Sequence, residues 1–489
     1  MMSLWDALRM NMMISYQELV RTFPNYLYLF LGNCFSVTQS QGDKMTILRK
    51  PMLRRFTAAL AFISLAINTA YANSSQVGIA PVARTTLKES ILFAIDRDPS
   101  ISQQAAQLGI GQAQIDEARS GWMPQISLNG STGHSQTTDS SGSLKNSAAW
   151  GLSLTQLIYD FGKTNNSISQ SSAQRDSYRY QLMSTLSDVA EKTALSYVEV
   201  KRYADLLQAA KENVQALKNV EQLAKLRADA GVSSTSDELQ TRTRIAGMQA
   251  TVAQYQAALN SARARLAVLT GMQAENYSPV PANLAVEPDS LNRIDYSLIP
   301  AVMAAQNMER SAQYGVETAK SQHWPTLSLK GGRTRYESDN RSYWDDQIQL
   351  NIDAPLYQGG AVSARVRQAE GARAMASSQV DQARFDVLQK ASVAQADWTG
   401  ARGRMEAGKQ QLENALRARD VYKNEYTLSK RSINDLLSVE QDVWQATSAK
   451  IIAEYDGWSS AINYASAVDN LMPLIGIEKS AAAKLPDLS

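Results

Sequence analysis

Few side chains in this 489-residue sequence could carry out covalent or metal chemistry. Cys34 is its single cysteine, and His134 and His323 are its two histidines. A thiol nucleophile needs a base beside it, and a metal site needs ligands at a fixed spacing. None of the three has such a partner, and Gly359-Gly360 lacks the spacing of a phosphate-binding loop. We therefore predict no enzymatic activity, no metal and no cofactor.

Charged residues also gather in two short segments with related sequences. Asp237 lies in "AGVSSTSDEL" (230–239) and Asp435 in "SKRSINDLL" (429–437), 198 residues later. Arg431, Ser432 and Asp435 stand where a helix is expected to begin, and a carboxylate there favours the positive end of the helix dipole. On spacing alone this is a helix cap.

The composition favours long helices over a mixed α/β enzyme. Only 20% of the residues are charged, and there are 13 prolines. The net charge of +2 gives no electrostatic reason to expect nucleic acid as a partner.

Residues 45–72 have the layout of a signal peptide. A basic segment precedes the apolar stretch Phe56 to Ile67 and the small-x-small motif Ala70-Tyr71-Ala72, so the mature chain is predicted to begin at Asn73. The alternative is a transmembrane anchor, but about 12 apolar residues are too few to span a bilayer. Residues 1–44 are expected to be an extended start, with Met45 or Met52 the true first residue.

The rest of the sequence is one unit of roughly 200 residues that occurs twice. "ARSGWMPQISLNG" (118–130) returns as "AKSQHWPTLSLKG" (319–331), and "LIYDFGK" (157–163) returns as "PLYQGGA" (355–361). The predicted parts are a first repeat (73–271), a linker (272–295), a second repeat (296–476) and a tail (477–489).

Each repeat is predicted to start with a helix that turns into a β-hairpin at a proline. The first helix runs from Thr86 to about Ser120 and meets Pro124, and the second runs from about Tyr296 to Gln322 and meets Pro325. A proline cannot continue the helical hydrogen bonds and pushes the preceding residue into extended geometry.

Both hairpins, at about 124–157 and 325–356, alternate apolar with polar residues over strands of around ten residues. That length and period are typical of transmembrane β-strands. Aromatic residues expected at the membrane interface flank them: Trp122, Tyr159, Phe161, Trp324 and Tyr357. Two soluble hairpins packed on a core are the alternative. The export signal and the lack of a globular domain to cover the strands favour the membrane.

After junctions at Gly162 and Gly360, long helices are predicted over 163–229 and 361–428, each followed by a return helix. Their apolar residues recur at heptad spacing, which predicts coiled coils. A periplasmic coiled-coil adaptor or scaffold would explain these helices but not the strands. Four strands cannot close a barrel, and an open sheet edge in lipid is costly. Three copies would give twelve strands around a lumen, so we predict a mostly α-helical homotrimer with a shared β-barrel.

The sequence resembles the TolC family of outer-membrane channel-tunnel proteins over about residues 82–477. The resemblance rests on the order and double occurrence of "EARSGWMPQISL" and "TAKSQHWPTLSL", "LTQLIYDFGK" and "APLYQGG", and "AGVSSTSDELQTR" and "SINDLLSVEQDVWQA". It implies a twelve-stranded barrel in the outer membrane, a helical tunnel in the periplasm, and an equatorial region around the linker.

The family resemblance also implies a gate at the periplasmic end of the tunnel. Tyr426 and Arg431 match the gate tyrosine and arginine, with Ser236 and Asp237 as partners. Asp435 matches one of two acidic rings at the entrance. Ser438 stands where the second ring usually has aspartate, which implies weaker cation binding there.

Family members serve drug-efflux pumps or type I protein secretion. The run "INDLLSVEQDVWQA" and the absence of a cysteine to carry a lipid resemble the secretion branch, with multidrug efflux as the alternative. The implied partners are a periplasmic adaptor protein, an inner-membrane ABC transporter or antiporter, and outer-membrane lipid.

Overall fold

The computed structural model describes residues 79–135, 145–284, 287–288, 291–338 and 341–477. The predicted extension and signal peptide (1–44 and 45–72), and all but one residue of the tail, lie outside them. The described residues belong to a single unit, Val77–Ser489.

Prolines divide the first helix of each repeat. The predicted helix from Thr86 to Ser120 is two helices, α4 (Leu87–Arg97) and α5 (Pro99–Ser120), because Asp98 caps a new helix and Pro99 lacks the N–H that would continue the old one. In the second repeat the 3₁₀ turn η3 (Tyr296–Leu298) likewise precedes α8 (Pro300–Ser321). A capping box begins α4: the Thr86 hydroxyl accepts the Glu89 N–H, and the Glu89 carboxylate accepts the Thr86 N–H.

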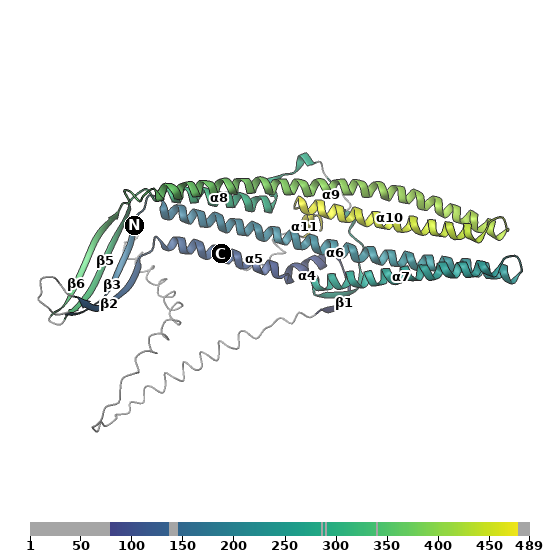
Figure 1. Ribbon diagram of the computed structural model, residues 1–489, viewed down its shortest axis with the longest axis horizontal. Helices are drawn as coiled ribbons and strands as arrows, with labels where there is room; N and C mark the ends of the chain where they lie inside the picture. Colours follow the sequence, from purple (N-terminus) through teal and green to yellow (C-terminus); the bar gives the residue numbers. More distant parts are fainter. Residues whose placement is uncertain (1–78, 136–144, 285–286, 289–290, 339–340, 478–489) are drawn as a thin grey trace, which may run out of the picture. The chain divides into compact units, whose positions relative to one another are not determined.

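Two hairpins follow these helices and join into one antiparallel sheet (Figure 1). The strands are β2 (Gln125–Ser135), β3 (Lys145–Tyr159), β5 (Thr326–Ser338) and β6 (Arg341–Asp353). Their order is β2-β3-β5-β6, so β3 and β5 join the two repeats and β2 and β6 are the edges. His134 falls within β2.

The strand register gives the sheet one polar face and one largely apolar face, which carries Arg333, Arg335 and Asp346 toward the far ends of β5 and β6. Leu128 lies opposite Leu152, and Leu329 opposite Leu350. The apolar face is exposed to solvent in the single chain through Ile126, Leu128, Trp150, Leu152, Leu154, Leu329, Ile348, Leu350 and Ile352. The other face is polar, with the hydroxyls of Ser127 and Ser153 2.7 Å apart. The predicted alternation is therefore present in all four strands.

Each hairpin continues into a helix of 67 residues, α6 (Lys163–Asp229) or α9 (Ala361–Thr427). A sharp turn leads to the return helices α7 (Thr235–Thr270) and α10 (Ile433–Ala467). These turns have the same backbone, because Gly231 (φ 71°) and Ser429 (φ 57°), 198 residues apart, are both left-handed. The strand ends and the helical turns lie at opposite ends of α6 and α9 (Figure 1).

A second, small sheet lies near the middle of α6. The parallel strands β1 (Ala80–Thr85) and β4 (Met272–Tyr277) pair there. The buried Tyr197 hydroxyl donates to the Ser278 carbonyl at 2.7 Å and ties this sheet to α6. Two 3₁₀ turns, η1 (Ala282–Leu284) and η2 (Leu291–Arg293), and the short helix α11 (Leu471–Leu474) complete this region.

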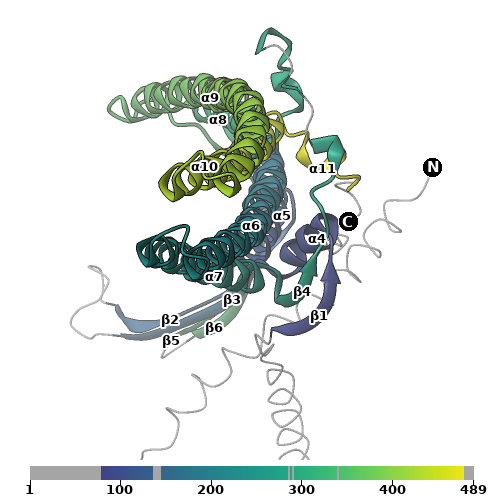
Figure 2. The same ribbon diagram turned by 90° about the vertical axis from the view of Figure 1, so that its right-hand side faces the viewer.

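The two long helices differ in how much of their surface is covered. Viewed along the helices, α6 lies between the α7 and α10 helices, whereas α9 lies at the end of the row (Figure 2). Twenty residues of α6 are buried but only ten of α9. No helix in the described ranges combines the length and apolarity needed to cross a bilayer.

Candidate functional site

The two helical turns lie side by side and share one apolar cluster. Tyr426, at the end of α9, is only 2% exposed and packs with residues from both turns. Its buried neighbours in this cluster are Leu217, Val220, Ile245, Met248, Ile433, Leu436 and Leu437. Burial raises the pKa of the Tyr426 phenol, and the Asp237 carboxylate adds to that shift, while Arg227 opposes it. Two predicted gate residues, Tyr426 and Asp237, thus interact electrostatically.

Arg227, which was not predicted as a site residue, links the two turns directly. Its Nη1 donates to the backbone carbonyl of Tyr426, and its Nη2 donates to Ser429 Oγ at 2.8 Å. The guanidinium also lies over the Tyr426 ring, 4.4 Å from the centroid, in a cation–π contact. A charge reversal could have indicated this residue, since the equivalent position 198 residues later is Glu425.

Arg431 makes its contacts within its own turn. Its Nε lies 2.9 Å from Glu425 Oε2, and its guanidinium lies 4.3 Å from the centroid of the Tyr422 ring. Within the single chain it pairs with Glu425, not with Ser236 or Asp237. Ser236 is exposed at the start of α7, and its N–H donates to Ser234 Oγ at 3.2 Å. The gate contacts of Arg431 with Ser236 and Asp237 stay a prediction.

Asp435 forms the cap that its spacing suggested. Its carboxylate accepts the N–H and the hydroxyl of Ser432 at 3.2 and 2.9 Å, and its own N–H donates to Ser432 Oγ. These hydrogen bonds, with a smaller contribution from Arg431, lower the pKa of Asp435. The side chain is therefore held ionised at the turn, and its place in an acidic ring stays a prediction.

At the opposite end, Gly162 and Gly360 begin α6 and α9 in left-handed conformations (φ 88° and 81°). Pro124 and Pro325 stand immediately before β2 and β5. The buried Asp160 carboxylate caps α6, accepting the Thr164 N–H at 2.7 Å. This cap was not predicted from the sequence.

The predicted interfacial aromatics divide between the middle and the edges of the sheet. Phe161 stacks on Trp324 at 5.5 Å and meets Tyr159 edge-on at 4.7 Å. Trp122, beside the edge strand β2, donates from Nε1 to Asn165 at 3.1 Å. Tyr357, beside the edge strand β6, is 87% exposed. Their location at a membrane interface remains a prediction.

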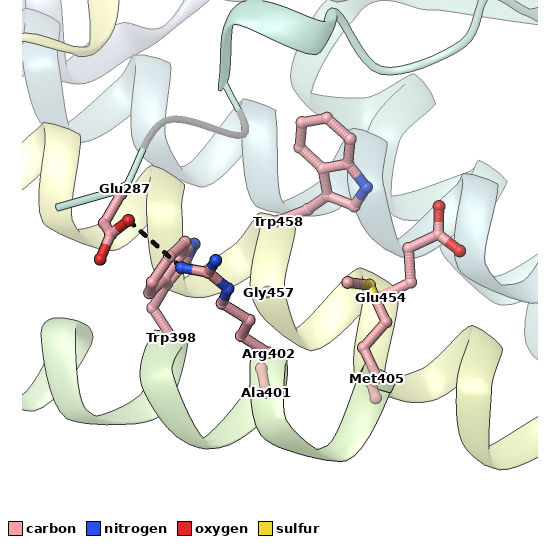
Figure 3. Close-up of a pocket in the computed structure, with 9 residues that line it drawn as sticks. Glu287, Trp398, Ala401, Arg402, Met405, Glu454, Gly457 and Trp458 are labelled. Atoms are coloured by element: carbon pink, nitrogen blue, oxygen red, sulfur yellow. Dashed lines mark hydrogen bonds and ion pairs between the residues drawn. The ribbon is translucent and has the colours of Figure 1, made fainter. Parts of the chain in front are cut away.

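A groove of about 380 Å³ lies between α9 and α10 (Figure 3). Trp398, Met405 and Trp458 line it, and Arg402 pairs with Glu287 at 3.2 Å across its mouth. The described residues hold no cluster of three or more His, Cys, Asp or Glu that could bind a metal. The groove therefore offers a largely apolar surface beside the Arg402–Glu287 ion pair.

Comparison with known proteins identifies the family. The model of the outer membrane efflux protein family matches residues 93–272 and 298–467, one segment in each repeat. The outer membrane efflux protein BepC of Brucella suis is 25% identical over 386 residues, 76% of this chain and 82% of that protein. The outer membrane protein TolC of Escherichia coli is 24% identical over 404 residues, 76% of this chain and 80% of TolC.

A more distant relative and a solved structure extend the comparison. The alkaline protease secretion protein AprF of Pseudomonas aeruginosa is 21% identical over 407 residues, 77% of this chain and 83% of AprF. The outer-membrane channel OprN has the same fold, with a TM-score of 0.69 at 20% identity over 78% of this chain and 90% of OprN. The chain therefore belongs to the outer membrane efflux protein family, as a TolC-family channel-tunnel of the outer membrane whose helices form a tunnel in the periplasm.

Proposed function

We propose that three copies of this chain assemble into one channel, with β6 of each copy paired to β2 of the next. The observation that carries this proposal is the four-stranded sheet, which has an exposed apolar face and two open edges. In lipid each unpaired backbone group of an open edge costs several kcal/mol, so the edges must be joined. Twelve strands leave a lumen lined by the polar face, whereas eight would be filled by side chains.

The periplasmic end of this channel is closed by the paired turns. Arg227 and Tyr426 hold the two turns of one copy together, and the exposed Ser236 and Arg431 are available to neighbouring copies. Asp435 contributes one acidic side chain per copy to the entrance. A periplasmic adaptor and an inner-membrane transporter would deliver the substrate and open the gate.

The proposed cargo is protein exported by type I secretion. The run "INDLLSVEQDVWQA" supports this, as does the relationship to a protease secretion protein. Multidrug efflux is the second candidate, favoured by the relationship to BepC, which is named an efflux protein.

A deletion strain tests the cargo. We expect loss of a protein from the culture medium, restored by the intact gene, with drug sensitivity changed less than about twofold. A strain that becomes drug-sensitive while its secreted proteins stay unchanged would favour efflux instead.

Conductance tests the channel itself. In a planar lipid bilayer the purified protein should open pores of small conductance, because the paired turns narrow the periplasmic end. A protein that inserts no pores under conditions in which E. coli TolC does would contradict the channel.

A further inference from the structure

The largely apolar face of the four-stranded sheet carries charged and aromatic side chains toward the strand ends farthest from the helices. Along β5 this face changes from Leu329 to Arg333 and Arg335. The register places Arg335 directly between Trp150 of β3 and Trp344 of β6. Side chains directly opposite each other share one face of a sheet. Two arginines and two tryptophans therefore gather on the face that carries the exposed leucines.

The two tryptophans position the two arginines. The rings of Trp150 and Trp344 meet edge-on with their centroids 5.4 Å apart, although β5 lies between their strands. The guanidinium carbons of Arg333 and Arg335 lie 4.7 and 5.4 Å from the centroid of the Trp344 ring. Tryptophan is the ring that makes the strongest cation–π contacts. One indole ring thus holds two positive charges beside each other.

A carboxylate accompanies each arginine. Arg333 Nε lies 3.3 Å from Asp346 Oδ1, and Arg335 Nε lies 2.9 Å from Glu337 Oε1. Arg335 Nη2 also donates to Ser342 Oγ at 3.3 Å. Each guanidinium has five N–H donors, so one ion pair does not use its capacity. Exposed ion pairs of this kind contribute little stability, and a phosphate group can share or replace the carboxylate.

The distance along the strand fits the outer surface of a membrane. Arg333 and Arg335 follow Thr326, the first residue of β5, by seven and nine positions. At about 3.4 Å per residue and a tilt of about 40°, they lie roughly 18 and 23 Å higher. The apolar band of a transmembrane barrel is about 25 Å tall, and charges facing lipid are tolerated only near its borders. With the helices in the periplasm, this border belongs to the outer leaflet.

The cluster belongs to the second repeat alone. The sequences of β2 and β5 align with an offset of 201 residues, so Leu329 corresponds to Leu128 and Arg333 corresponds to Thr132. Both hairpins therefore share the apolar part of this face, whereas β5 adds the arginines. An apolar surface for lipid tails does not need them, so we looked for a ligand that does.

We propose that this cluster binds the phosphorylated sugar headgroup of lipopolysaccharide in the outer leaflet. Arg333 and Arg335 bind phosphate oxygens, because the planar guanidinium matches their geometry. Trp150 and Trp344 pack their apolar ring faces against the sugar rings. A glycerophospholipid also offers a phosphate, but it has no phosphorylated sugar to cover the two indoles. The inference rests on the proposed barrel, which turns this face toward lipid.

Native mass spectrometry of the detergent-extracted protein, titrated with diphosphoryl lipid A, tests the site. The variant R333Q/R335Q removes both positive charges. The variant R333K/R335K keeps the charges and removes only the planar guanidinium, which makes it the milder change for folding. K330Q is the matched control, because Lys330 lies on the same strand but on the polar face, opposite Gln349. Phosphatidylglycerol serves as the comparison lipid.

We expect the parent protein to bind up to three lipid A molecules per trimer. R333Q/R335Q should bind lipid A at least about tenfold more weakly, because hydrogen bonds to charged groups are lost. R333K/R335K should bind several-fold more weakly, K330Q should match the parent, and phosphatidylglycerol should bind the parent more weakly than lipid A does.

The same spectra contain the results that would contradict the proposal. Parent-like lipid A binding by either arginine variant in a protein of trimeric mass would overturn the site and leave the channel standing. An equal loss in K330Q would show that binding follows overall charge and would also overturn it. Phosphatidylglycerol that binds as tightly as lipid A would overturn the choice of a sugar headgroup. A monomeric mass for the parent protein would overturn the barrel and the site together.

Discussion

The two repeats share a backbone plan and differ in their surroundings. Their long helices have equal lengths of 67 residues, and their turns place left-handed residues at matching positions. Yet α6, between two neighbours, carries small or polar residues such as Ser177 and Ala190 where α9, at the edge, carries Met375 and Leu388. Side-chain size therefore differs with how much of each helix surface is covered within the chain.

Exchanging residues between the repeats should break this relationship most strongly. Ala190 is fully buried, so Ala190→Leu forces extra volume into a packed core and should destabilise the fold by about 1–3 kcal/mol. The reciprocal change Leu388→Ala on the exposed face of α9 should leave the fold of one chain nearly unaffected. Thermal melting followed by circular dichroism measures both, and equal losses would contradict the difference between the helices.

The turns provide a second contrast, between Arg227 and its counterpart Glu425. Arg227→Ala removes a cation–π contact and two hydrogen bonds that join the turns, worth roughly 1–3 kcal/mol together. We expect the closed channel to conduct at least about twofold more in a planar bilayer. Glu425→Ala releases only Arg431 within one turn and serves as the comparison. Unchanged conductance in the Arg227→Ala variant would show that the contacts of Arg227 with the second turn do not help to keep the channel closed.

The junctions between strand and helix differ in the same way. Asp160 caps α6 with its buried carboxylate, whereas the equivalent Gln358 at α9 is exposed. Asp160→Ala should cost about 1 kcal/mol of stability, the usual value of a helix cap, and Gln358→Ala should cost almost nothing. The melting temperatures of the two variants measure this difference. A larger loss of stability from Gln358→Ala than from Asp160→Ala would contradict the role of Asp160 as a helix cap.

The smallest expected effect concerns Glu440, which is 5% exposed, while its counterpart Arg242 is exposed and paired with Glu221. Burial raises the pKa of Glu440, with Arg419 and Lys423 opposing the shift. The folded chain therefore keeps this proton to a higher pH than the unfolded chain does. The free energy of unfolding therefore falls as the pH rises from the pKa of this carboxyl in the unfolded chain to its pKa in the folded chain. Above that range the charged form remains unfavourable in the folded chain.

Glu440→Gln removes this penalty. The variant should melt about 2–4 °C higher than the parent protein at pH 7.5, and the gap should close as the pH falls below the carboxyl range. Arg242→Gln is the matched control and should show no such pH-dependent gain. A gap that stays constant with pH would show that ionisation of Glu440 is not its cause.

Local patterns in the sequence were enough to predict the long elements. The absence of glycine and proline from 163–229 predicted α6, and alternation predicted the four strands, because both signals lie within one element. The break at Pro99 was missed, since proline starts a helix as readily as it ends one. The β1–β4 pair was missed because two six-residue strands pair across almost 200 residues of sequence.

The contacts at the turns were harder to predict because they depend on how two distant helical pairs approach each other. Arg227 reaches Tyr426 across 199 positions, and no local pattern marks it apart from the charge reversal with Glu425. The pairing of Arg431 with Glu425 is likewise visible only once the turn is built.

The mass of the detergent-extracted assembly tests the central claim most directly. Native mass spectrometry should give three copies of the chain, which joins β6 to β2 three times and closes twelve strands around the lumen. A single copy or a pair, or a protein that stays in solution without detergent, would contradict the shared barrel.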